Sequence, residues 1–342
     1  MRMSQQRHTN RRPGPRQTAR GERILSVAAA LVLLFAPIFA QAQPVVPPAA
    51  VEQFQHVIGS RVEAVTILGG DYGAGGGIYT FRGGEVANLS VTKVGGGGIV
   101  AEPRPLGESG LRWAPVLQGN LGHISAQNEF ATGYLQGNKS VYDVLAVQGG
   151  GGARFFFTDH FSVAPAVSGI YGHTENEFKP QNAVGDHVKA VASGTYVDWN
   201  LDTWSVEPSL DLNYDFHWQR TTFEFGSRYN FFHTESFNSS SSVVGVSGDS
   251  HTWENKLDVD VPLGWKLFER ELHTGGFFSR TELFGSAAEG LNENHIYTVN
   301  GRFVMDLLGK VWKVHWLGVG FSYFWGDHFG GWSAGLDLRF KF

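Results

Sequence analysis

The sequence predicts an all-β fold, a transmembrane antiparallel β-barrel of about 12 strands. Three observations predict it: an export signal at the N-terminus, long segments in which apolar and polar residues alternate, and an alternating segment that runs to the final residue, Phe342. After the signal, no apolar run is long enough for a membrane helix. A membrane protein without such helices must be a closed barrel, because closure satisfies every backbone polar group in lipid.

Residues 1–42 are predicted to be a cleaved signal peptide. Seven arginines precede an apolar stretch at 24–40, and Ala40-Gln41-Ala42 supplies the small residues that signal peptidase requires. A non-cleaved anchor helix is the alternative, although this stretch contains Pro37 and is short for a bilayer crossing. We expect Sec-type export to the bacterial outer membrane, cleavage after Ala42, and a mature chain that begins at Gln43.

Composition excludes several classes of protein. Without residues 1–42 the chain keeps 20 basic and 31 acidic residues, a net charge of −11 that argues against nucleic acid as a partner. The absence of cysteine excludes disulfides, thiolate metal sites and a lipoprotein anchor. Glycine (45 residues) and aromatic residues (13%) exceed their usual share of a soluble globular domain.

Strict alternation marks the predicted strands. Residues 204–217 and 332–342 alternate apolar and polar at every position, and weaker alternation covers 223–231, 257–263, 297–305 and 317–325. A soluble β-sandwich also alternates, but it turns its charges outward, whereas a membrane barrel turns them into the lumen. Thirteen candidate strands can be marked from Gly75 to Phe342, and the even number expected of a bacterial barrel makes twelve our estimate.

Turn lengths suggest which rim faces which side of the membrane. Residues 158–160 and 201–203 are predicted tight links suited to the periplasmic rim, whereas 175–186, 238–250 and 286–294 are predicted longer polar loops. Across residues 217–271 the predicted connections do not alternate between short turns and long loops, so the assignment of long loops to the outside fails there.

The segment before the barrel has a different character. Residues 44–50 are rich in proline and alanine, and apolar residues then recur at roughly helical spacing: Val51, Phe54, Val57, Ile58, Val62 and Val65. We expect one short amphipathic helix, either inside the lumen as a plug or at the periplasmic rim; an unstructured segment is the alternative. The predicted domains are therefore the signal peptide (1–42), a linker or plug helix (43–74) and the barrel (75–342).

Several stretches resemble the solitary outer-membrane autotransporter β-barrel family. The matching stretches are ILGGDYGAGGGIYTF (67–81), ARFFFTDHFSVAPAVSGIYG (153–172), DVDVPLGW (258–265), GGFFSRTELFG (275–285) and LGVGFSYFWGDHFGGWSAGLDLRFKF (317–342). The resemblance implies a barrel of about twelve strands with an N-terminal helix in or near the pore, and no large secreted passenger. The Asn-Asn junction at which some passenger-bearing relatives cleave themselves is absent.

Charged residues at the polar positions of the strands are expected to face the lumen. They are Glu207, Asp211, Asp215, Glu224, Arg228, Asp258, Asp260, Arg280, Glu282, Arg302, Asp337 and Arg339. They could line an ion- or solute-selective pore, or they could pair across strands into a network that fills a narrow lumen. The expected plug favours the network.

We predict no catalytic, cofactor-binding or metal-binding residues, and no enzyme activity. The thirteen histidines form no HExxH motif, and Asp159-His160, Asp186-His187 and Asp327-His328 fall in predicted turns. Glycine runs at 75–77, 95–98 and 149–152 lack the Gly-Lys-Ser/Thr of a phosphate loop and indicate bends or close backbone approach, including approach of the plug helix.

The expected function is that of an integral outer-membrane barrel of autotransporter type, without passenger, with a structural, pore-like or surface-interaction role. A diffusion porin or ligand channel is the alternative. A hydrolase or acyltransferase at the barrel rim is a third, with His160, His173, His187 and His328 as its candidate residues. The expected partners are outer-membrane lipid and lipopolysaccharide, and the barrel-assembly machinery through the strand that ends at Phe342.

Overall fold

The computed structural model describes residues 55, 58–64, 75–81, 86–130, 135–307 and 314–340. The chain divides into two units, Met1–Gln53 and Phe54–Phe342, and the fold described here is that of the second. The predicted signal peptide and Phe342 lie outside the described residues.

Long antiparallel strands make up most of this unit. They are β1 (Gly75–Phe81), β2 (Val86–Ile99), β4 (Arg112–Glu129), β5 (Lys139–Phe156), β6 (Phe161–Lys179), β7 (Asn200–Trp218), β8 (Thr221–Ser239), β9 (Ser247–Leu267), β10 (Arg270–Gly285), β11 (His295–Asp306), β12 (Val314–Trp325) and β13 (Phe329–Phe340). A two-residue strand, β3 (Arg104–Pro105), pairs only with the start of β4. No helix in the described residues is both long and apolar enough to cross a membrane.

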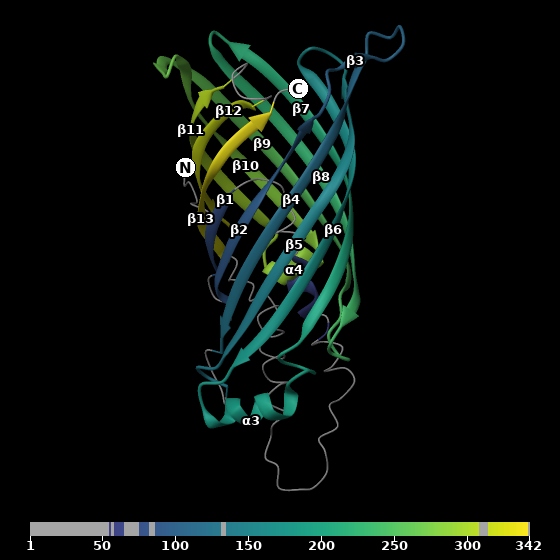
Figure 1. Cartoon of the computed structure of the whole chain (residues 1–342), viewed down its shortest axis with the longest axis vertical. Helices are drawn as coiled ribbons and strands as arrows, with labels where there is room; N and C mark the ends of the chain where they lie inside the picture. The colour runs from purple at the N-terminus through teal and green to yellow at the C-terminus, as the bar shows by residue number, and fades with distance from the viewer. Residues whose placement is uncertain are drawn as a thin grey trace, which may run out of the picture. The chain divides into compact units, whose positions relative to one another are not determined.

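The strands close into a barrel (Figure 1). β1 pairs with β2, β2 pairs directly with β4, and each strand from β4 to β12 pairs with the next along the chain. β13 pairs with β1, from Gly76 opposite Ala334 to Phe81 opposite Phe329. Within the described residues the closed ring contains twelve strands, β1, β2 and β4 to β13. The predicted all-β barrel and the estimate of twelve strands are confirmed.

The polarity of the two faces distinguishes this barrel from a soluble sandwich. On β7, the apolar side chains of Val206, Leu210 and Leu212 are exposed, whereas Glu207 is buried and Asp211 is half-buried. Carboxylates therefore point inward and aliphatic side chains outward. That inversion is stable only where lipid, not water, covers the outer wall.

The two rims of the barrel carry different connections. One rim, here called the turn edge, carries the tight turns 157–160, 219–220 and 268–269, and also the longer connection 100–111 between β2 and β4, which contains β3. The opposite rim, the loop edge, carries the long connections 180–199 and 286–294, which contain α3 (Ala183–Ala192) and α4 (Ser286–Leu291). The turns at 219–220 and 268–269 fall on one rim because two antiparallel strands, β8 and β9, lie between them, and the connection 240–246 falls on the other rim. This arrangement resolves the conflict across 217–271.

Two predicted connections are wrong. Residues 201–203 lie within β7, not in a turn, and β6 continues to Lys179, beyond the predicted loop start at 175. Both errors have one cause: the strands extend past the apolar part of the barrel, and their polar ends look like loops in the sequence. The connection between β6 and β7 is instead 180–199.

Local capping explains α3. The Asn182 side chain accepts a hydrogen bond from the backbone N–H of Gly185 at 2.8 Å, which satisfies one of the free donors of the first turn. Asn138, fully buried, donates to the Asn182 side chain and accepts from the N–H of Gln181 at 2.7 Å. The two loops at this part of the loop edge are therefore tied together.

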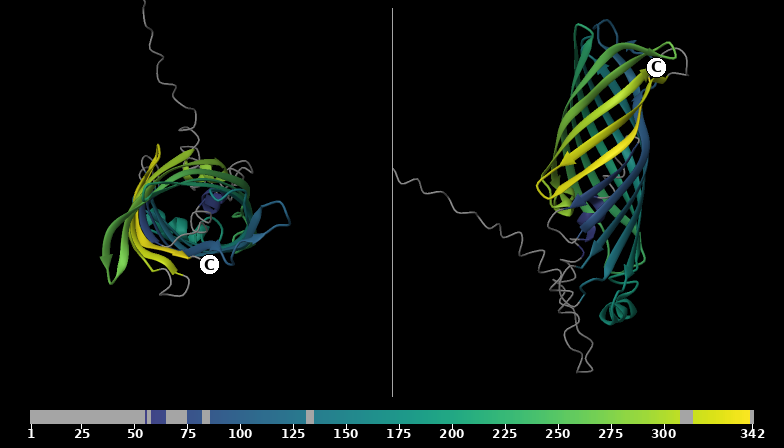
Figure 2. Two further views of the ribbon diagram at one scale, coloured as in Figure 1. Left: turned by 90° about the horizontal axis from the view of Figure 1, so that it is seen from above. Right: turned by 90° about the vertical axis from the view of Figure 1, so that its left-hand side faces the viewer.

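A helical segment lies inside the ring. Residues 58–64 are helical, and Figure 2 shows this segment, in purple, within the ring when the barrel is seen from above. Ile58 and Val62 pack in one apolar cluster with Trp199 and Leu201. Their contacts place the segment in the half of the lumen next to the loop edge.

Candidate functional site

The interior helix is anchored to the barrel by a buried carboxylate. Glu63 is 1% exposed, and the hydroxyl of Ser250 on β9 donates to its Oε1 at 2.5 Å. The same Ser250 oxygen accepts the backbone N–H of Ala287, at the start of α4, at 2.9 Å. One serine therefore connects the interior helix, the wall and α4.

Burial changes the acidity of this group. Desolvation raises the pKa of Glu63 above its ordinary value of 4.5, and hydrogen bonds from Ser250 and Ser286 oppose only part of that rise. The interior helix is therefore held more favourably when Glu63 is protonated than when it is ionised.

The helix also touches α4 through backbone atoms. A Cβ placed on Gly290 would stand 2.2 Å from the carbonyl oxygen of Ser60. Only glycine permits this approach without movement. Ala64 joins Ala287 and Leu291 in a second apolar cluster on the same side. The loop 286–294 thus folds inward over the helix.

Ion pairs fill the lumen nearer the turn edge. Arg302 of β11 donates two hydrogen bonds to Asp258 of β9, at 2.8 and 2.6 Å, in a bidentate pair whose side chains are 2% and 5% exposed. Such a fork is the strongest form of the arginine–carboxylate interaction. It joins β9 and β11 across the intervening β10.

Other predicted lumen charges also have partners. Arg228 lies 3.5 Å from Glu207, whose second oxygen accepts a 2.5 Å hydrogen bond from Gln148. Asp211 lies 3.6 Å from Arg154, and Asp260 contacts His273 at 2.7 Å. This arrangement fits the predicted cross-strand network.

Arg280 and Glu282 are exceptions, because they face outward. Position 278 pairs with Leu257 on the outer face and position 277 with Asp258 on the inner face, so even-numbered residues of β10 point out. The sequence alone could not show whether the odd- or the even-numbered residues of β10 face the lumen, because Phe277 and Phe278 are both apolar. The backbones of Asp337 and Arg339 lie in β13, but their side chains are outside the described residues.

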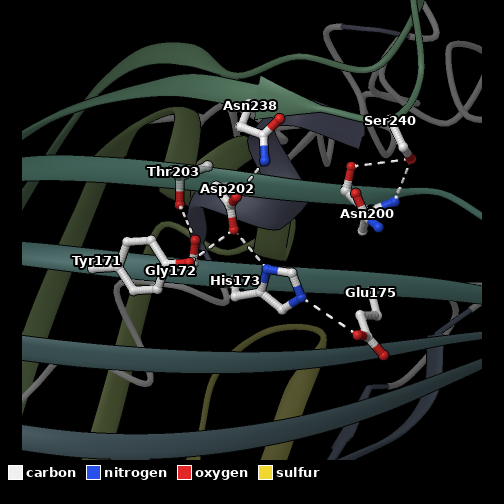
Figure 3. Close-up of polar contacts among 9 residues, drawn as sticks. All are labelled: Tyr171, Gly172, His173, Glu175, Asn200, Asp202, Thr203, Asn238 and Ser240. Atoms are coloured by element: carbon white, nitrogen blue, oxygen red, sulfur yellow. Dashed lines mark hydrogen bonds and ion pairs between the residues drawn. The ribbon is translucent and has the colours of Figure 1, made fainter.

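A polar cluster lies on the outer face near the loop edge (Figure 3). Asp202 of β7 contacts the Nδ1 of His173 at 2.6 Å and accepts hydrogen bonds from the Tyr171 hydroxyl at 2.8 Å and the Asn238 amide at 2.7 Å. The Nε2 of His173 lies 3.4 Å from Glu175. The imidazole is thus held between two carboxylates.

The same arrangement occurs two strands away. On β8, the Nδ1 of His233 lies 2.8 Å from Asp249 and its Nε2 lies 3.4 Å from Glu235. Both clusters come from the sequence His-Thr-Glu, at 173–175 and at 233–235, with each threonine buried on the inner face. Sequence reasoning missed these clusters, although the repeated tripeptide was a usable signal.

The four histidines considered for catalysis are dispersed. His160 lies at the turn edge, His173 on the outer face, His187 on α3, and His328 in the connection between β12 and β13. The hydroxyl that shares Asp202 with His173 belongs to Tyr171. These positions do not assemble one common site.

The described glycines of the runs at 95–98 and 149–152 sit where neighbouring strands approach closely. A Cβ on Gly95, Gly150 or Gly152 would lie under 2.8 Å from backbone of the adjacent strand, whereas Gly96 and Gly149 have nothing within 4 Å. Close approach is therefore confirmed for alternate positions, but it is between strands. The predicted approach to the interior helix occurs instead at Gly290.

The chain matches a known protein family. The solitary outer membrane autotransporter β-barrel domain matches residues 104–336, most of the barrel. The chain belongs to this family. No curated protein matches it significantly. Membership places this solitary autotransporter barrel in the bacterial outer membrane, in agreement with its apolar outer wall.

Solved structures support the same fold. The β-domain of the Bordetella autotransporter BrkA is 17% identical, with a TM-score of 0.52, and the match covers 79% of this chain and 100% of that one. The transport unit of the autotransporter AIDA-I from Escherichia coli is 10% identical, with a TM-score of 0.50, over 78% of this chain and 88% of that one. At these identities the likeness concerns the fold alone.

Proposed function

We propose that this solitary autotransporter barrel works without a secreted passenger, as a non-enzymatic outer-membrane barrel whose lumen is kept closed by its own interior helix. The observation that carries the proposal is the buried contact of Glu63 with Ser250 and α4 inside the ring. The paired charges of the turn-edge half support it, because side chains bound to one another leave less free volume for a permeating solute.

Planar-bilayer conductance tests this function. The full mature chain should conduct little, and deletion of residues 43–66 should open steps of conductance, because the lumen loses its helix but keeps its wall. A wild-type channel that is already open would overturn the proposal and support the diffusion porin. Equal, negligible conductance of both proteins would show that the ion-pair network, not the helix, closes the pore.

We propose that the turn edge faces the periplasm and the loop edge the outside, as expected for outer-membrane barrels. The chain has no cysteine, so single introduced thiols report cleanly. Val191→Cys on α3 should react with a membrane-impermeant maleimide on intact cells, and Phe268→Cys at the turn edge should react only after lysis; both side chains are well exposed. The reverse labelling pattern would invert the orientation.

The proposed maturation begins with Sec-type export and cleavage after Ala42. The N-terminal sequence of the protein extracted from outer membranes should therefore start at Gln43. A start at Met1, with the apolar segment retained, would show an uncleaved anchor instead.

The proposed assembly partner is the barrel-assembly machinery, which would bind the C-terminal strand. In the finished barrel β13 pairs with both β12 and β1, so before closure it presents a free edge for strand addition. Deletion of Phe342 should reduce insertion in cells and leave refolding in detergent intact. Loss of both would indicate a simple folding defect, and loss of neither would remove the proposed recognition role of Phe342.

The proposed lipid contacts are the outer-leaflet headgroups, lipopolysaccharide among them, around the His173–Asp202 cluster. On β7 the apolar outer side chains end at Trp204, and Asp202 is the next outward residue toward the loop edge. Aromatic residues followed by polar ones mark the membrane interface of a barrel. Asp202→Cys should react with a water-soluble maleimide in reconstituted vesicles, and Val206→Cys should not. Equal reactivity at both positions would move the interface elsewhere.

A further inference from the structure

Three side chains of types that can bind metal ions lie together at the turn edge. His160, Asp215 and His217 place one ligand atom each within 4.8 Å of one another. The Nδ1 of His160 is 3.4 Å from Asp215 Oδ2, and the Nδ1 of His217 is 4.0 Å from the same oxygen. We propose that these three residues bind a divalent transition-metal ion of the zinc class.

The distances suit such an ion. Zinc bonds of about 2.0–2.1 Å in tetrahedral geometry put neighbouring ligand atoms about 3.3–3.4 Å apart. The His160–Asp215 separation already has this value, and His217 lies 4.0 Å from Asp215, so it must approach that oxygen by a fraction of an ångström. The ligand atoms of the two histidines lie within 4.8 Å of each other. Because both imidazoles are exposed, they have room to make this adjustment.

The backbone fixes two of the ligands relative to each other. The N–H of Asp215 donates to the carbonyl oxygen of His160 at 2.9 Å, which joins the turn 157–160 to β7. Within the turn, Thr158 Oγ1 accepts from the N–H groups of His160 and Phe161. Arg112 holds the adjacent Asp159 at 2.7 Å. A clamped turn lowers the entropy cost of bringing the ligands together.

The ligand set also selects the class of metal. Imidazole nitrogen suits zinc, copper, nickel and iron, whereas calcium and magnesium prefer oxygen ligands throughout. Asp215 pairs in register with Glu224 of β8, so a second carboxylate on the inner face adds negative charge nearby. Three protein ligands would leave one position for water or an external ligand, as in open zinc sites.

Metal titration of the folded full chain tests the site. The protein is purified with a histidine-free tag, stripped with a chelator and titrated with Zn²⁺ in a calorimeter. His160→Asn, Asp215→Asn and His217→Asn should each weaken the tightest site by at least the roughly 10- to 100-fold that loss of an outer-shell partner costs. The matched controls are His187→Asn on α3 and His328→Asn, both exposed and outside the group.

Two further measurements distinguish metal binding at these three residues from binding elsewhere on the protein and from misfolding of the variants. Co²⁺ in place of Zn²⁺ should give a visible absorption band that disappears in His160→Asn and stays in His187→Asn. Heat-dependent gel mobility checks that each variant forms a barrel. The proposal is overturned if the folded variants bind Zn²⁺ with wild-type stoichiometry and affinity, or if Ca²⁺ competes equally with Zn²⁺.

Discussion

Glu63 on the interior helix and Ser250 on the barrel wall share a hydrogen bond although they lie 187 residues apart in the chain. The bond attaches the helix to β9 at a position closed off from solvent. Because burial raises the pKa of Glu63, protonation of this carboxyl group adds to the packing contacts that hold the helix.

The first prediction is a pH-dependent closure of the lumen. A raised pKa in the docked state means that the contribution of Glu63 to docking is complete below its ordinary value of 4.5 and is lost as pH rises through the raised value. Single-channel conductance of the wild type should therefore be lowest in acid and increase as pH rises above 4.5.

The matched control is Glu63→Gln. The amide oxygen can still accept from Ser250, but the side chain remains neutral at every pH, so conductance should stay low throughout the range. A pH response that persists unchanged in Glu63→Gln would assign the effect to another group.

The second prediction concerns the Arg302–Asp258 pair. Arg302→Met leaves the Asp258 carboxylate without its bidentate partner in a buried place, and removal of one member of a buried pair costs about 3–5 kcal/mol. The urea midpoint in detergent micelles should fall accordingly. In the double variant Arg302→Met/Asp258→Leu both members of the pair are replaced by apolar side chains, so most of that loss should be recovered. A double variant as unstable as the single one would contradict this account.

The third prediction tests the close contact of β5 with β6. A Cβ on Gly152 would lie 2.1 Å from the carbonyl oxygen of Pro165, so Gly152→Ala forces the two strands apart. Overpacking of this kind costs about 1–3 kcal/mol. Gly149→Ala, three residues earlier with open space around it, is the control and should be neutral or slightly stabilising. Equal urea midpoints for the two variants would show that the strands adjust freely.

The barrel and its inverted polarity could be predicted because they depend on a local, period-two pattern. Residues 204–217 carry that pattern without interruption, and their pairing partners follow it. Two features could not be predicted. The first is which residues of β10 face the lumen: the adjacent Phe277 and Phe278 leave this ambiguous, and only their pairing with Asp258 and Leu257 decides it. The Glu63–Ser250 contact depends on how the chain returns into its own lumen, and no local pattern records that.

The fourth prediction tests which face of β7 meets lipid. Leu210 is 42% exposed on the outer face, between Trp204 and Tyr214, whereas Ser209 beside it faces the lumen. An arginine on the lipid face near the bilayer midplane costs about 2–4 kcal/mol. Leu210→Arg should therefore lower the urea midpoint in lipid vesicles strongly, and Ser209→Arg should lower it less because the lumen already holds paired charges. In a soluble sandwich the order would reverse, since an arginine at an outward position would meet water. Greater destabilisation by Ser209→Arg than by Leu210→Arg would thus reject the membrane-facing assignment of this wall.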